Sequence, residues 1–579
     1  MIKPRNNRIK STAKPKLNLT SNQKSTFKRS INSKGKPKKV TTRIVDFNTD
    51  TPEAEVAIIN YQLPHKFGSK VIAECKKLSK LKIDKKNRRD LRNLAFVTID
   101  GDDAKDFDDA VFAEIIKDSQ QNKKNITNNF KWRLFVAIAD VSFFVEPNTA
   151  IDNEAYLRAT SVYFPRLVVP MLPPILSENL CSLIPQADRP VMICEIELDR
   201  LGEIHNFNFY NGLIKSHSRL TYKQVESFLF NKSKFTKNKN LTNQVQNNLV
   251  ILKDIYFALR HQREKRGALD LDSKEYKFTF KNKKVDSIYL DDRGESNKLI
   301  EECMIAANIC AAKFLENKTK TLFRVHEPPE KDKLSNLKHQ LRSFGIKKIK
   351  KLGKATINSK IFAELLAKIK TNKYSEMLQH LILRSLKNAI YTPNNQGHFG
   401  LGLTHYAHFT SPIRRYPDLL VHRGIKKIIK DLENKKISQK KISRTKIHLP
   451  TERNWVIAGE HCSYCEKRAD SASRDANMML RCELAKKDLG DALAASVSGI
   501  TKFGIFVQLE RSYADGLVPI KAISRYYDDY IEFDEANKCL YSPRNRKTIR
   551  LCAKVIVRIH QIDSWDRKME LELIKIYNS

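Results

Sequence analysis

The chain has 579 residues, of which 106 are lysine or arginine and 65 are aspartate or glutamate, so its formal net charge is +41 at pH 7. A charge of this size indicates nucleic acids or anionic membranes as partners, with solubility alone as the alternative, and says nothing about the fold. Hydrophobic residues make up 41% of the chain, but no apolar run reaches the ~18 residues of a transmembrane helix or forms a secretory signal, so we expect neither membrane spans nor export.

The N-terminal segment is basic and polar. Residues 1–45 contain no acidic residue, and fourteen lysines and arginines lie between Lys3 and Arg43. Such a segment cannot bury enough apolar area to offset its ordering entropy, so we predict a disordered basic tail over residues 1–44. It would act as a phosphate-binding arm or as a solubilising or targeting extension, an organelle transit peptide included. Residues 45–92 are predicted to form a connector packed on the next domain.

Residues 93–429 are predicted to form a large α+β domain. Runs of apolar and β-branched residues predict strands, at Leu94–Ile99, Ala110–Ile116 and Trp132–Ala139. Helical spacing of apolar residues predicts helices, at Leu299–Glu316 and Ala363–Ile369. Residues 430–489 are predicted to be a helical continuation of this domain, with a lysine-rich stretch at Lys426–Lys446 and a helix through Glu460–Leu489.

The ten cysteines are scattered, without the spacing of a small disulfide-rich domain, so we interpret them as reduced thiols of a cytoplasmic protein. Cys303 and Cys310 fall on one face of the predicted helix Leu299–Glu316 and are expected to be core residues. Cys462 and Cys465 form one CxxC pair. A single pair is weak evidence for zinc, so we favour a buried helix face for it.

The C-terminal residues 490–576 have a different pattern. Short strands separated by turns are predicted, at Ala492–Ser498, Gly504–Leu509, Gly516–Ile520, Ala553–Ile559 and Lys568–Ile574. This spacing is typical of a small β-barrel. The expected fold class is therefore α+β, with a large mixed domain followed by a C-terminal barrel.

Six aspartates lie within the ten residues Asp100–Asp109, between two predicted strands. In an extended segment Asp106 and Asp108 share one face, and Phe107 between them is expected to pack inward. Carboxylates held this close repel one another unless a cation binds, and oxygen-only ligands suit Mg²⁺ or Mn²⁺. Next to an RNA phosphate, such an ion would activate a water molecule and stabilise the leaving oxygen. The alternative is a solvated acidic loop.

A second candidate segment runs from His405 to Asp418. Thr410 or Ser411 followed by Pro412 is a helix-start signal, which places Arg414 and Arg415 in a first helical turn, where the helix dipole also favours anions. These arginines would clamp a phosphate or stabilise charge in the transition state. The alternative is a structural pair bonded to Asp418 or to nearby carbonyls.

Three further residues are candidates for lining an RNA groove. Tyr163 has an aromatic ring that can stack on an RNA base, although tyrosines are more often part of a core. Arg324 and His326 lie close together in the sequence and would matter only beside the other segments.

Taken together, these segments resemble the ribonuclease II / ribonuclease R family, over roughly residues 45–575, and its ribonuclease R-like members most. The resemblance is carried by Ile99–Val111, Ser161–Pro165, Val169–Pro173, Cys181–Leu183, Phe323–Pro329, Gly397–Leu401 and Ala407–Arg423. It implies a catalytic domain, called RNB, whose deep channel admits single-stranded RNA, and an S1-type OB-fold at the C-terminus. It also implies processive 3′-to-5′ cleavage to nucleoside 5′-monophosphates, with unwinding of structured RNA that has a 3′ overhang.

The resemblance also assigns roles to individual residues. Asp100, Asp106 and Asp109 match metal ligands, and Asp108 matches the carboxylate of the same set that is most critical to cleavage. The other matches are Arg414 beside the scissile phosphate, Tyr163 stacked near the 3′ end, Glu466 at the channel floor, and Phe503 and Phe506 as stacking aromatics on the strand Thr501–Leu509. Arg415 is a candidate RNA contact because of its place beside Arg414 in the arginine segment. Pro519 stands where the family often has a histidine that contacts RNA.

The leading hypothesis is a magnesium-dependent exoribonuclease, with Mn²⁺ as the other candidate ion. Its expected partners are single-stranded RNA 3′ ends and the ribosome or RNA-decay machinery, with no membrane. Relatives of this type carry cold-shock domains before the catalytic domain, and too few residues precede Asp100 here for two of them. An RNA-binding protein without efficient turnover is therefore the alternative, and a DNA nuclease is a third hypothesis. Without a Gly-rich loop ending in Gly-Lys-Ser/Thr, ATP-driven unwinding is not expected.

Overall fold

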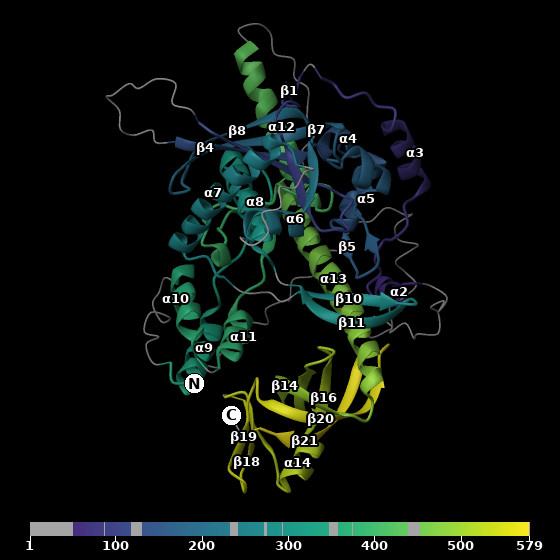
Figure 1. Ribbon diagram of the computed structural model, residues 1–579, viewed down its shortest axis with the longest axis vertical. Helices are drawn as coiled ribbons and strands as arrows, with labels where there is room; N and C mark the ends of the chain where they lie inside the picture. Colours follow the sequence, from purple (N-terminus) through teal and green to yellow (C-terminus); the bar gives the residue numbers. More distant parts are fainter. Residues whose placement is uncertain are drawn as a thin grey trace, which may run out of the picture. The chain divides into compact units, whose positions relative to one another are not determined.

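The computed structural model describes residues 50–85, 87–116, 130–231, 241–270, 275–291, 293–346, 357–372, 374–437, 452–535 and 537–577. The predicted basic tail and residues 438–446 of the predicted lysine-rich stretch lie outside these ranges. Within the ranges, none of the helices combines the length and the apolar character needed to cross a membrane. Figure 1 shows the described elements in chain order, from α2 to β21.

Two helices occupy the segment that we expected to be a connector, α2 (Pro52–Asn60) and α3 (Ser69–Leu78). Pro52 is the first residue of α2, a position where the missing N–H of proline would have no intrahelical partner in any case. Small residues of α2 pack on small residues of the long helix α13 (Glu452–Ala485), in a cluster that includes Ala54, Ala57, Ala469, Ala472 and Ala476. The segment is thus anchored on the helical part of the domain that follows.

A seven-stranded sheet forms the centre of the large domain, in the order β1-β8-β7-β4-β3-β2-β9. Its strands are β1 (Arg89–Asp90), β2 (Val97–Asp100), β3 (Asp109–Ile115), β4 (Phe130–Ala139), β7 (Asp188–Asp199), β8 (Ile204–Lys215) and β9 (Ser218–Thr221). The inner pairs are antiparallel, whereas β1 runs parallel to β8 and β9 runs parallel to β2. The first three predicted strands correspond to β2, β3 and β4.

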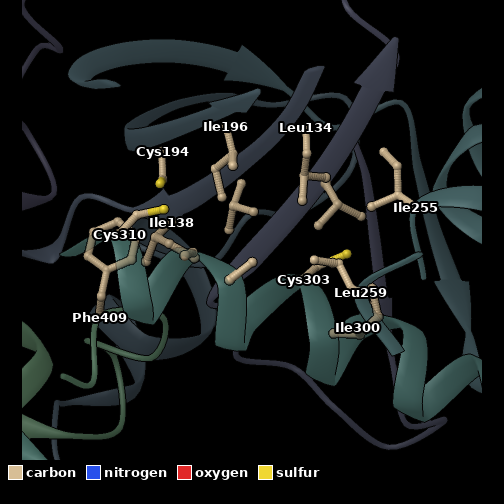
Figure 2. Packing of buried hydrophobic residues seen from close by; sticks show 14 of the residues in the cluster. Leu134, Ile138, Cys194, Ile196, Ile255, Leu259, Ile300, Cys303, Cys310 and Phe409 are labelled. Atoms are coloured by element: carbon tan, nitrogen blue, oxygen red, sulfur yellow. The ribbon is translucent and has the colours of Figure 1, made fainter. Parts of the chain in front are cut away.

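Both faces of the sheet are buried, and successive residues of β4 alternate between two cores. Leu134 and Ile138 point to one side, where they meet α7 (Asn243–Arg266) and α8 (Glu295–Leu315), while Phe135 and Ala137 belong to the core on the other side. Figure 2 shows the first core, with the side chains of β4 and β7 above those of α8. Cys303 and Cys310 lie in it, which confirms that this face of the predicted helix is core.

The second core is closed by helices that position the candidate site. They are α4 (Val141–Phe144), α5 (Ala150–Arg158), the π-helix η2 (Ile175–Leu180), α12 (Tyr416–Ile437) and α13. Cys462 and Cys465 are buried in this core, and none of the ten cysteines, all of which lie in the described ranges, is paired in a disulfide. The interpretation of the CxxC pair as a buried helix face is therefore confirmed.

Smaller elements complete the domain. Two short hairpins are β5 (Val162–Tyr163) with β6 (Val168–Val169) and β10 (Glu275–Lys281) with β11 (Lys284–Asp291), and a further two-stranded sheet pairs β12 (Phe323–Val325) with the distant β13 (Ile390–Thr392). The remaining helices are α6 (Tyr222–Leu229), α9 (Lys331–Ser343), α10 (Ser359–Ile369), α11 (Ser375–Ser385), and the 3-10 turns η4 (Phe399–Leu401) and η5 (Lys486–Asp488). Helices α9, α10 and α11 share a separate hydrophobic core.

The C-terminal part is a closed barrel in the order β14-β15-β16-β21-β20, as expected. Its strands are β14 (Ala492–Thr501), β15 (Gly504–Leu509), β16 (Asp515–Pro519), β20 (Lys554–Asp563) and β21 (Lys568–Ile576). Between β16 and β20 the chain adds elements that the sequence pattern did not predict: α14 (Ile520–Tyr527) and a small sheet of β17 (Glu532–Asp534), β18 (Cys539–Ser542) and β19 (Lys547–Ile549). The fold class is thus α+β with a C-terminal barrel, as predicted.

Candidate active site

The aspartate segment joins two neighbouring strands of the central sheet. Asp100 is the last residue of β2 and Asp109 is the first residue of β3. Because these strands are antiparallel neighbours, the end of one and the start of the other lie at the same edge of the sheet. Strand pairing therefore brings the two carboxylates together, and residues 101–108 form the loop between them.

The loop is anchored around Phe107, which is buried as predicted. Its N–H donates to Oγ of Ser182 and its carbonyl accepts from the N–H of Leu183, both at 3.0 Å. The carbonyl of Asp108 accepts from the N–H of Ala139 at the end of β4, at 2.9 Å. These bonds tie the loop backbone to the rest of the domain, so Asp106 and Asp108 project from a held segment.

Asp108 is the most buried of the four predicted ligands, with 5% of its side chain exposed. Its Oδ1 accepts from the backbone N–H of Ile413 at 2.8 Å. Its Oδ2 is buried and accepts no hydrogen bond, and it lies 3.6 Å from Nε of Arg414. One oxygen of Asp108 is therefore fixed by the arginine segment, while the other is buried without a hydrogen-bond donor.

Asp106 is linked to Tyr163. The phenol hydroxyl of Tyr163 donates to Oδ2 of Asp106 at 3.0 Å, and the carbonyl of Tyr163 accepts from Oγ of Ser473 on α13 at 2.8 Å. The residue is 41% exposed, so it is not a core tyrosine. The structure thus places the predicted stacking residue directly beside the predicted metal ligands.

Burial and mutual repulsion raise the pKa values of three of these carboxyl groups. Burial is the main cause of the raised pKa of Asp108. Burial and the charge of Asp100 raise the pKa of Asp109, and burial and the charge of Asp106 raise the pKa of Asp100. The guanidinium of Arg414 opposes all three shifts but does not cancel them. The site therefore has less positive charge than its carboxylates require.

A divalent cation fits this deficit. The donors are all carboxylate oxygens, which hard cations prefer, and Oδ2 of Asp108 is a buried oxygen with no donor. The four carboxylates do not form a closed ligand cluster. Among the residues that the structure describes, the one group with three potential ligand atoms within 4.8 Å of one another lies elsewhere, on the β7–β8 turn, and consists of Asp199, Glu203 and His205. The site therefore brings the carboxylates into one region, but their oxygens do not surround a single ion position.

The structure adds a residue that the sequence did not indicate. Arg219 lies on β9, next to β2, and its Nη2 donates to the carbonyls of Gly101 at 2.7 Å and of Asp102 at 2.9 Å. Its charge also lowers the pKa of Asp100, although burial and Asp106 outweigh it. No local pattern marks this arginine, because it reaches the loop only through the parallel pairing of β2 and β9.

The arginine segment corrects one prediction. Helix α12 begins at Tyr416, so Arg414 and Arg415 lie in the turn before the helix and not in its first turn. The N–H groups of both arginines donate to the carbonyl of Ser411, and the carbonyl of Arg414 accepts from the N–H of Ser161 at 3.0 Å. This backbone is engaged in tertiary contacts, which is why the helix starts later than the Ser-Pro signal suggested.

Arg414 and Arg415 differ in their surroundings. The side chain of Arg414 is 43% exposed, and its Nη2 donates to Oγ of Ser411 at 3.0 Å. The side chain of Arg415 is mostly buried and donates to Oδ1 of Asp418 at 2.8 Å. Arg415 thus has the structural partner of the alternative interpretation, and Arg414 is the arginine that borders the carboxylates.

Glu466 lies with a different group of residues. Its Oε2 accepts from Nη1 of Arg324 at 2.6 Å, and the guanidinium of Arg324 lies over the ring of Tyr391. The other predicted groove residue, His326, accepts the N–H of Gly400 at Nδ1. None of these three predicted residues forms a described contact with the aspartate loop.

The barrel aromatics are placed differently from the prediction of one strand over Thr501–Leu509. Thr501 ends β14, Phe503 lies in the turn, and Phe506 is on β15. Gly504 makes the turn possible with φ +146°, where a Cβ would meet the carbonyl oxygen of Val518 at 2.2 Å. The two rings are edge to face, with centroids 6.1 Å apart, and Phe503 is half exposed.

Comparison with known protein families matches both parts of the chain. Residues 88–431 match the RNB domain, and residues 486–573 match the S1 RNA binding domain. The first match spans more than half of the chain and contains all four aspartates and Arg414. The chain belongs to the RNB family.

Relatives and solved structures agree with this assignment. Ribonuclease R of Escherichia coli is 40% identical over 85% of this chain, and that of Thermotoga maritima is 35% identical over 94%. The Mycoplasma genitalium RNase R, solved in complex with ribose methylated single-stranded RNA, superposes with a TM-score of 0.79 at 30% identity, over 91% of this chain and 78% of that one.

This RNB chain spans 58% of the length of the E. coli relative and 73% of the Thermotoga one. A requirement for a divalent metal ion is consistent with the family and with the carboxylate donors described above.

Proposed function

We propose that this chain is a processive 3′-to-5′ exoribonuclease that hydrolyses single-stranded RNA and releases nucleoside 5′-monophosphates. The observation that carries the proposal is the buried carboxylate of Asp108, which has one oxygen fixed by Ile413 and the other without a hydrogen-bond donor, beside the half-exposed Arg414. This unpaired oxygen is available to a cation, because buried polar atoms of native proteins are as a rule hydrogen-bonded. RNA with a duplex and a 3′ overhang is included in the proposed substrates.

We assign Mg²⁺ as the ion, with Mn²⁺ as a substitute, and Asp100, Asp106, Asp108 and Asp109 as the residues that hold it. When bound, it supplies positive charge to the phosphate oxygens and makes a water molecule more acidic. The raised pKa values of Asp100, Asp108 and Asp109 mean that binding also displaces protons from these groups.

The chain's own residues orient the RNA. Arg414 has guanidinium N–H groups beyond the one bound to Ser411, and these would bind the non-bridging oxygens of the scissile phosphate. Tyr163 would stack on a base while its hydroxyl stays on Asp106. Water attacks phosphorus, the 3′-oxygen of the preceding nucleotide leaves and takes up a proton, and the product is a mononucleotide with a 5′-phosphate.

The remaining assignments follow from the same proposal. Phe503 and Phe506 would bind RNA upstream of the site by stacking, and Glu466 with Arg324 would shape the path to it. Arg415 would act mainly by holding the turn that carries Arg414, through its bond to Asp418. A cytoplasmic location and an association with the ribosome or RNA-decay machinery remain predictions.

The deciding experiment uses 5′-labelled single-stranded RNA with Mg²⁺. We expect a shrinking labelled core and accumulating 5′-mononucleotides, with no reaction in chelator and none on DNA of the same sequence. Asp102→Asn serves as the matched control for Asp108→Asn, because Asp102 lies in the same loop but is exposed and paired with Lys223. Intact RNA after long incubation with folded protein, or tight binding without mononucleotides, would refute the proposal.

A further inference from the structure

Three segments of the barrel domain converge on a cluster of exposed tyrosines and cations at the C-terminal end of α14. Tyr526 is 39%, Tyr530 73% and Tyr577 46% exposed. The cations are Arg525 on α14 and Arg546 in the β18–β19 turn, both exposed. We call these five residues the α14 patch.

The patch is held together by hydrogen bonds that cross the fold. Nδ2 of Asn545, in the β18–β19 turn, donates to the carbonyl of Tyr527 at 2.8 Å. The N–H of Ile576, at the end of β21, donates to the hydroxyl of Tyr526 at 3.3 Å. The helix end, the turn and the end of β21 are thus adjacent, and Figure 1 shows α14 beside β21. The ring of Tyr526 is fixed while part of it stays open to solvent.

The charges of the patch favour an anionic partner. Among the residues that the structure describes, no acidic side chain forms an ion pair with Arg525 or Arg546. The exposed acids between Asp528 and Glu535 are Asp528, Glu532 and Glu535, whereas Asp529 is buried and bonded to Ser542. Nζ of Lys575 lies 4.8 Å from the centroid of the Tyr577 ring, so a further cation borders the patch. Rings that bases can stack on, next to unpaired cations, are the features that bind single-stranded nucleic acid.

The position of the patch relates it to the barrel aromatics. The N–H of Ile520, the first residue of α14, donates to the carbonyl of Phe503 at 2.9 Å. Phe503 therefore lies at one end of α14 and the patch at the other, about 12 Å apart for a helix of eight residues. A strand that stacks on Phe503 needs only a few more nucleotides to reach Tyr526.

We propose that the α14 patch is a second RNA-binding surface of the barrel domain, which takes single-stranded RNA upstream of the nucleotides stacked on Phe503 and Phe506. This inference rests on the proposed function, because it assumes that RNA occupies the barrel. It adds a separate claim: long RNA is held at both ends of α14, whereas RNA too short to leave the catalytic domain does not contact the patch.

The test measures RNA affinity by fluorescence anisotropy, with the full chain carrying Asp108→Asn to prevent cleavage. The probes are oligoadenylates of about 6 and about 30 nucleotides, below and above the span of one barrel domain with the catalytic site. Tyr526→Ala with Tyr530→Ala should weaken binding of the long probe by at least about 25-fold and leave the short probe unchanged, since each of the two lost stacks is worth a factor of about 5 or more. Tyr464→Ala, at a tyrosine on α13 that is 63% exposed, is the control and should change the affinity for neither probe.

A second variant avoids any doubt about folding. Arg525→Glu with Arg546→Glu changes only exposed charges and should reduce the slope of log affinity against log salt by about 1.4 for the long probe, the value for two lost phosphate contacts on a single strand. If the affinity for long RNA is unchanged in both variants, the proposal that the α14 patch binds RNA is overturned, and the proposed function is unaffected. Failure of the Asp108→Asn chain to bind either probe overturns both proposals.

Discussion

Replacing Arg219 by methionine would remove the side chain that ties the aspartate loop to β9. Nη2 of Arg219 holds two consecutive carbonyls, those of Gly101 and Asp102, at 2.7 and 2.9 Å. A hydrogen bond from a charged donor contributes about 1.5–3 kcal/mol when buried, and the partial exposure of these carbonyls lets water replace some of it, so we expect a loss of about 1–2 kcal/mol in unfolding free energy. The larger effect should be on the geometry of Asp100 and its neighbours.

Residues that orient metal ligands by hydrogen bonds, without binding the metal themselves, typically change metal affinity or activity by about 10- to 100-fold when they are removed. We therefore expect Arg219→Met to raise the Mg²⁺ concentration for half-maximal RNA cleavage by about that factor, with little change in KM for RNA. Arg219→Lys should recover part of the loss, because an ammonium reaches one carbonyl but not two in a fixed geometry.

The assay is a Mg²⁺ titration of mononucleotide release, with direct Mg²⁺ binding by calorimetry as a readout that does not depend on turnover. Lys223→Met is the control, since its bond to Asp102 is largely exposed and such pairs contribute little. If Arg219→Met is as stable as the parent and binds Mg²⁺ equally well, the loop does not depend on this arginine and the reasoning is refuted.

Asp108→Asn should reduce the rate of RNA cleavage by at least about 10³-fold, while RNA affinity should stay within about twofold of the parent. A cleavage assay measures the rate, and fluorescence anisotropy measures the affinity. In Tyr163→Ala, loss of a stacked base should raise KM about tenfold, whereas Tyr163→Phe keeps the ring and should stay near the parent; equal KM values for both would exclude stacking. Burial raises the pKa of Asp109 in the folded chain, so the folded state binds the extra proton and its stability falls as pH rises above about 4, the ordinary value. In chelator, thermal melts should therefore show that the stability of Asp109→Asn relative to the parent increases with pH, and Mg²⁺ should reduce that increase. A stability difference that does not change with pH would contradict the raised pKa of Asp109.

Local patterns predicted a good part of this fold. The alternation in β4 and the helical spacing of α8 are visible in the sequence because burial repeats with the geometry of each element, every two or every 3.6 residues. The five barrel strands were recognised for the same reason. Elements with weak periodicity were missed, such as the small sheet of β17, β18 and β19.

Two boundary errors have a common cause. The start of α12 was placed before Tyr416, and Phe503 was placed on a strand and not in a turn. In each case a local signal was correct in kind, but contacts from distant segments moved the boundary: Ser161 holds the backbone at Arg414, and Ile520 holds it at Phe503. Terminal residues of helices and strands are where such contacts compete with local preference.

The candidate ligands could be named from the sequence because they are close neighbours along the chain, and six carboxylates in one short segment already imply an electrostatic problem that a cation solves. The residues that surround these ligands could not be named from the sequence. Ile413, Tyr163 and Arg219 contact the aspartate segment across 305, 57 and more than 100 positions of sequence. Such contacts depend on which strands pair and which loops pack together, and no local repeat encodes that choice. The tertiary structure alone therefore decided which oxygen of Asp108 is held and which arginine borders the site.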